Sequence, residues 1–183
     1  MLSRLCLAAV LALSPLSAPP LLAKAVPLAI AELDRQLGAL EAFMGRVDAL
    51  SDAELEKVMV AMFTELAGWS GDACTLGPQE VAGAEARLAA TGVMYRLMGG
   101  EAGFSPAVAA VLGSAADFDA LLASLRETAG TAADPAVYLG RIDVLAAGWG
   151  AASGKLAGAF DAASNSGALR MEGEVMRIAD CTG

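Results

Sequence analysis

Residues 134–163 read DPAVYLGRIDVLAAGWGAASGKLAGAFDAA, and this stretch decides the fold class. Asp134 followed by Pro135 is a strong start signal for a helix, because proline is favoured in the first turn. Apolar residues then recur at alternating steps of four and three, the spacing of one helix face: Tyr138, Ile142, Leu145, Trp149, Ala152, Leu156 and Ala159. The spacing predicts one continuous helix to about Ala163.

Three glycines fall on one face of this predicted helix: Gly150, Gly154 and Gly158. Glycine inside a helix lowers helix stability by up to about 1 kcal/mol relative to alanine. We therefore expect these glycines to allow a close packing contact that offsets the loss. We favour close packing against a neighbouring helix of the same bundle, and the alternative is membrane insertion or oligomer formation. Charged residues leave no uncharged run of about 20 residues, which disfavours a membrane span: Arg141, Asp143, Lys155 and Asp161.

The same apolar spacing covers most of the remaining chain. It predicts helices over residues 27–49, 51–70, 78–98 and 105–112, another from Ser114 or Asp117 to about 129, and a last one carrying Leu169, Val175 and Ile178. No alternation of apolar and polar residues persists long enough to predict a strand. We therefore expect an all-α protein, a single compact bundle of about six to seven helices.

The helix expected over residues 27–49 has an apolar stripe with two possible uses. It can pack into the protein's own core, which is the commoner use, or bind a partner helix. The stripe consists of Ile30, Leu33, Leu37, Leu40, Met44 and Val47. The next helix begins with a capping box, Ser51-Asp52-Ala53-Glu54.

The first 25 residues are typical of a cleaved signal peptide. Arg4 gives a positive start, an apolar run follows, and Ala23-Lys24-Ala25 has the small-x-small form of a cleavage site. Prolines interrupt the run before it reaches membrane-spanning length, which disfavours an uncleaved anchor: Pro15, Pro19 and Pro20. We expect a signal peptide over 1–25, an all-helical domain over 26–183 and a periplasmic or secreted location.

Composition excludes several classes of function. The chain has no histidine, so histidine-dependent nucleophiles, His-ligated zinc and proximal-His haem are ruled out. Its net charge of −9 becomes −11 without Arg4 and Lys24, which argues against nucleic acid as a partner. No phosphate-binding loop, haem motif or metal-ligand spacing occurs, so we expect no cofactor and no metal.

Two cysteines follow the predicted signal peptide, Cys74 and Cys181. An even pair in an oxidising compartment usually forms a disulfide. We expect a structural Cys74–Cys181 bridge that ties the C-terminus to a loop near the middle of the chain. The two residues lack the CxxC spacing of a redox-active pair.

One segment invites an enzymatic interpretation. Glu101-Ala102-Gly103-Phe104-Ser105-Pro106 resembles the E-S-x-F-[N/D]-P motif of lytic transglycosylases, helical envelope enzymes that cleave peptidoglycan. The resemblance implies Glu101 as the catalytic acid/base. Ala102 and Ser105 depart from the motif, and the family's later motifs are missing.

These observations favour a non-catalytic exported helical protein that binds or scaffolds another envelope component, with an envelope protein as the expected partner. The alternative is a peptidoglycan-cleaving enzyme that uses Glu101. A third interpretation, a small apolar ligand bound among methionines, is less favoured than ordinary core packing: Met44, Met59, Met62, Met94 and Met98.

Overall fold

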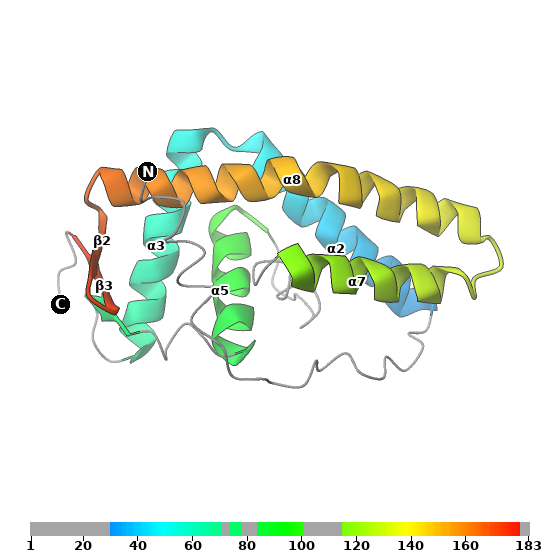
Figure 1. The fold of residues 1–183 in the computed structure, drawn as a ribbon, viewed down its shortest axis with the longest axis horizontal. Helices are drawn as coiled ribbons and strands as arrows, with labels where there is room; N and C mark the ends of the chain where they lie inside the picture. The colour runs from blue at the N-terminus through cyan, green and yellow to red at the C-terminus, as the bar shows by residue number, and fades with distance from the viewer. Residues whose placement is uncertain (1–29, 71–73, 78–83, 101–114, 180–183) are drawn as a thin grey trace.

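The computed structural model describes residues 30–70, 74–77, 84–100 and 115–179. Within these residues the chain forms five helices and three short strands, arranged as in Figure 1. The helices are α2 (Ile30–Ala49), α3 (Asp52–Ser70), α5 (Ala84–Leu97), α7 (Ala115–Ala129) and α8 (Pro135–Asn165). The strands are β1 (Thr75–Leu76), β2 (Leu169–Glu172) and β3 (Val175–Ile178). The protein is therefore mostly helical, as the apolar spacing predicts.

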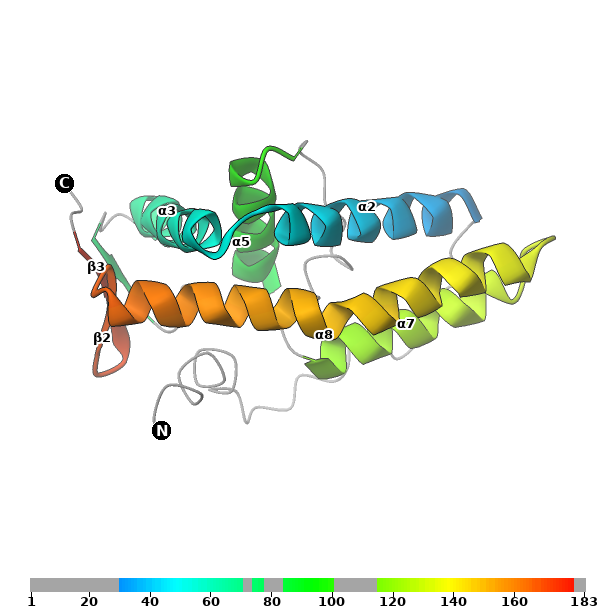
Figure 2. The same ribbon diagram turned by 90° about the horizontal axis from the view of Figure 1, so that it is seen from above.

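Helix α8 is the central helix, against which most of the other helices pack. It runs unbroken for 31 residues and packs against α2, α3 and α7 (Figures 1 and 2). It begins at Pro135, as predicted, although the Asp134 side chain makes no capping hydrogen bond. At the other end, Ser166 donates its backbone N–H to Ala162, and Gly167 adopts a φ of 79°. Glycine suits this left-handed conformation, and the helix ends two residues beyond the predicted end at about Ala163.

Two hydrophobic cores lie along α8. The first half of α8 packs with α7 and the start of α2, where Leu33, Leu37 and Leu40 are fully buried. The second half packs against α3 and β2 and contributes to a core that also includes residues of α5, the end of α2 and the other strands. Trp149 contacts both cores and stacks on Phe118, with ring centroids 4.4 Å apart.

The α2 stripe is used inside the protein. Leu33, Leu37, Leu40 and Val47 have no exposed surface, because α7 and α8 cover one half of the stripe and the second core covers the other. Complete burial of such side chains contributes about 1.5–3 kcal/mol each. The own-core interpretation of this stripe is therefore confirmed.

The predicted capping box at the start of α3 is present. The Ser51 backbone N–H donates to the Glu54 carboxylate at 2.8 Å, and the Glu54 N–H donates to Ser51 Oγ at 3.4 Å. This reciprocal pair satisfies two backbone donors that the helix leaves unpaired. The apolar face that follows is buried as expected at Leu55, Met59 and Met62.

The expected last helix is wrong. Residues 169–178 form a β-hairpin, in which Leu169 pairs with Ile178 and Glu172 with Val175. Strand β3 also pairs with β1, giving the strand order β1-β3-β2. The two residues between the hairpin strands begin with Gly173 at a φ of 66°, which favours a tight two-residue turn. Four-residue strands show too little alternation to be distinguished from helix by spacing.

The described residues contain fewer helices than the number expected for the chain. The described residues contain five helices, against the six to seven expected. The expected helix over 169–178 is the hairpin, and the one expected over 105–112 lies outside the described residues. The small sheet makes the fold mostly helical rather than all-α.

Candidate functional site

Charged side chains in the described residues join helices to one another. The clearest case is Lys155 of α8, whose ammonium group donates to three backbone carbonyls at the end of α2. The acceptors are Val47 at 3.1 Å, Asp48 at 2.8 Å and Leu50 at 3.0 Å. The last carbonyls of a helix lack partners within the helix and carry its negative dipole end, so the cation stabilises them.

Arg141 makes a second connection between α8 and α2. Its guanidinium donates to both oxygens of Glu41, at 2.7 and 2.8 Å, and to Asp34 at 2.6 Å. Paired Arg–carboxylate contacts of this kind fix geometry as well as charge. The two carboxylates raise the pKa of Arg141, chiefly through its hydrogen bonds to Glu41.

Three further arginines connect other helix pairs. Arg46 of α2 donates to the Met98 carbonyl at the end of α5 at 2.9 Å and lies 5.4 Å from the Tyr95 ring centroid. Arg96 pairs with Glu65 between α5 and α3. Arg126 pairs with Asp143 between α7 and α8 at 3.1 Å. Together with the contacts of Lys155 and Arg141, these contacts connect all five helices, and the set is called the frame of charged contacts below.

The resolved pKa shifts all favour the charged form. Hydrogen bonds from Arg35 and Gln36 lower the pKa of Glu32 to about 2, and Glu32 in turn raises the pKa of Arg35. Hydrogen bonds from Ser51 lower the pKa of Glu54. A general acid needs the opposite, a pKa raised towards neutrality. These carboxylates therefore have structural roles at helix starts.

The described residues also contain no group of three cysteine, aspartate or glutamate side chains placed to hold a metal ion. Glu101, the candidate acid/base, lies outside the described residues, so its role stays a prediction. Cys74 immediately precedes β1, and its backbone carbonyl accepts a hydrogen bond from the Ile178 N–H at 3.0 Å. Cys181 follows Ile178 by three positions but is not described, so its pairing with Cys74 stays a prediction.

The glycine prediction needs correction. Gly150, Gly154 and Gly158 lie on the exposed face of α8, and a Cβ added at any of them meets no atom within 4 Å. No helix in the described part of the chain therefore lies against them. Close approach occurs instead at Gly148, where an added Cβ lies 2.7 Å from Cε of Met44 on α2.

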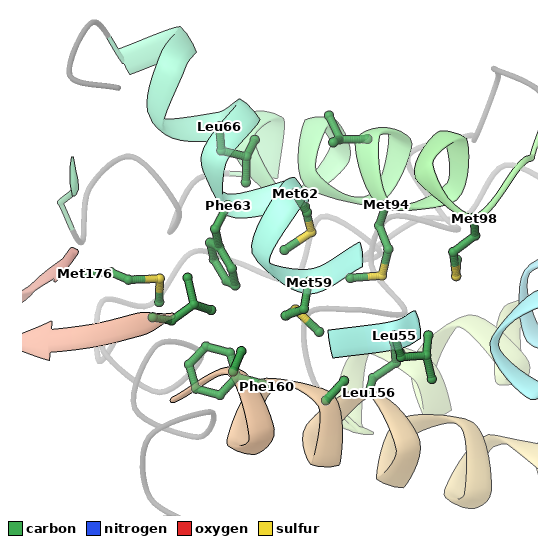
Figure 3. Packing of buried hydrophobic residues seen from close by; sticks show 14 of the residues in the cluster. Leu55, Met59, Met62, Phe63, Leu66, Met94, Met98, Leu156, Phe160 and Met176 are labelled. Carbon is green, nitrogen blue, oxygen red and sulfur yellow. The ribbon is translucent and has the colours of Figure 1, made fainter. Parts of the chain in front are cut away.

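The methionines serve as core. Met59, Met62, Met94 and Met98 have at most 7% of their surface exposed and fill the space where α3 and α5 pack (Figure 3). Met176 joins them from β3. Flexible thioether side chains fill irregular gaps of this kind.

Trp69 is a candidate contact residue that the sequence analysis did not identify. It continues the apolar spacing of α3 at its last turn, yet 59% of its surface is exposed. Large aromatic side chains are enriched at the energetic centres of protein interfaces. The apolar spacing predicts on which face of α3 Trp69 lies. Whether another element covers that face depends on the tertiary fold, so the exposure of Trp69 could not be predicted.

Comparison with protein-family models, with curated proteins and with solved structures finds no match to this chain. Within the described residues, none of the helices combines the length and apolarity needed to cross a bilayer.

Proposed function

We propose that this is an exported, non-catalytic helical protein that binds or scaffolds another envelope component, with Trp69 in the contact surface. The observation that carries the proposal is the exposure of Trp69 at the end of α3. The other tryptophan, Trp149, is partly buried, because it packs against both cores and stacks on Phe118. An indole left in water is available to a partner.

The frame of charged contacts supports this proposal. A scaffold benefits from a surface whose parts keep fixed positions, because little conformational freedom is then lost on binding. Lys155 and Arg141 hold α2 to α8, and Arg96 holds α5 to α3, the helix that carries Trp69. Export follows from the signal-peptide pattern of residues 1–25.

The test is recovery of partners from the envelope of the producing cells. Tagged wild-type protein is compared with Trp69→Ala and with Asp119→Ala, a matched change at an exposed position on α7. We expect one envelope protein to accompany the wild type and Asp119→Ala, and its recovery to fall at least tenfold with Trp69→Ala. Circular dichroism checks that all three proteins are folded.

Equal recovery with Trp69→Ala contradicts a contact through Trp69. A recovered protein that begins at Met1 rather than at Val26 contradicts export with cleavage.

A further inference from the structure

We draw no further inference here: the strongest candidate, the exposed outer face of α8 around Val137 and Val144, carries none because nothing in the described residues shows what covers it.

Discussion

Lys155 fixes how α2 meets α8. Its ammonium group contacts the Val47 and Asp48 carbonyls in the last turn of α2 and the Leu50 carbonyl just beyond it. Hydrogen bonds to charged groups contribute more to stability than neutral ones. Without Lys155 these carbonyls would also lose their hydrogen-bond donor. One side chain thereby sets the position of the α2–α3 connection.

Replacing this lysine should destabilise the protein. We expect Lys155→Met to lower the free energy of unfolding by about 1.5–3 kcal/mol, since methionine keeps the stem and removes the donor. Urea denaturation measures the change. Lys57→Met, at an exposed position on α3, is the control and should change stability by less than about 0.5 kcal/mol. Equal effects of the two substitutions contradict the role given to Lys155.

The glycines of α8 also differ from one another in how close their neighbours lie. Gly154→Ala should raise the free energy of unfolding by about 0.5–1 kcal/mol in dilute solution, because alanine favours helix and nothing lies within 4 Å of the new Cβ. Gly148→Ala should gain less or lose stability, because Met44 must move. Thermal unfolding of both variants checks the order. A larger gain at Gly148 contradicts the contact described between α8 and α2.

Among the elements, α2 has a start that depends on pH. Glu32 in its first turn has a pKa lowered from 4.5 to about 2 by hydrogen bonds from Arg35 and Gln36. Because the folded-state pKa is the lower one, its stabilising effect is complete above pH 4.5 and is lost as the pH falls towards 2. Glu32→Gln should therefore be less stable than wild type at pH 7, and the two should converge near pH 2. Denaturation across this range measures the difference, and a constant gap contradicts it.

The β-hairpin offers a matched pair of methionines. Met171 and Met176 face one another across β2 and β3, but Met176 is 4% exposed and Met171 42%. Met176→Ala should cost about 2–5 kcal/mol, because it empties a core site, whereas Met171→Ala should cost less than about 1 kcal/mol. Equal costs in denaturation experiments contradict the packing of the hairpin onto the second core.

Long elements were predictable and short ones were not. The 3–4 spacing that placed α2, α3 and α8 repeats over several turns, so chance matches are excluded. The hairpin strands have four residues each, which is too short for apolar spacing to distinguish strand from helix. The available signal was Gly173, a glycine between two short segments that contain apolar residues.

At the scale of the whole molecule, α8 joins two cores that no local pattern distinguishes. Leu40 and Phe43 lie within one turn of α2, yet they belong to different cores. The sequence predicts which face of each helix is apolar, but the neighbour that covers it depends on tertiary arrangement. For the same reason the glycines of α8 were expected to pack inside and instead lie exposed, and the exposure of Trp69 in the last turn of α3 was not predicted.

The central claim is that this frame presents Trp69 to another envelope component. Placing a photo-crosslinking residue at position 69 in producing cells tests it most directly, with position 119 of α7 as the control. The account predicts a covalent adduct with an envelope protein from position 69 and none from position 119. Adducts absent from position 69, or the same adducts from both positions, would contradict it.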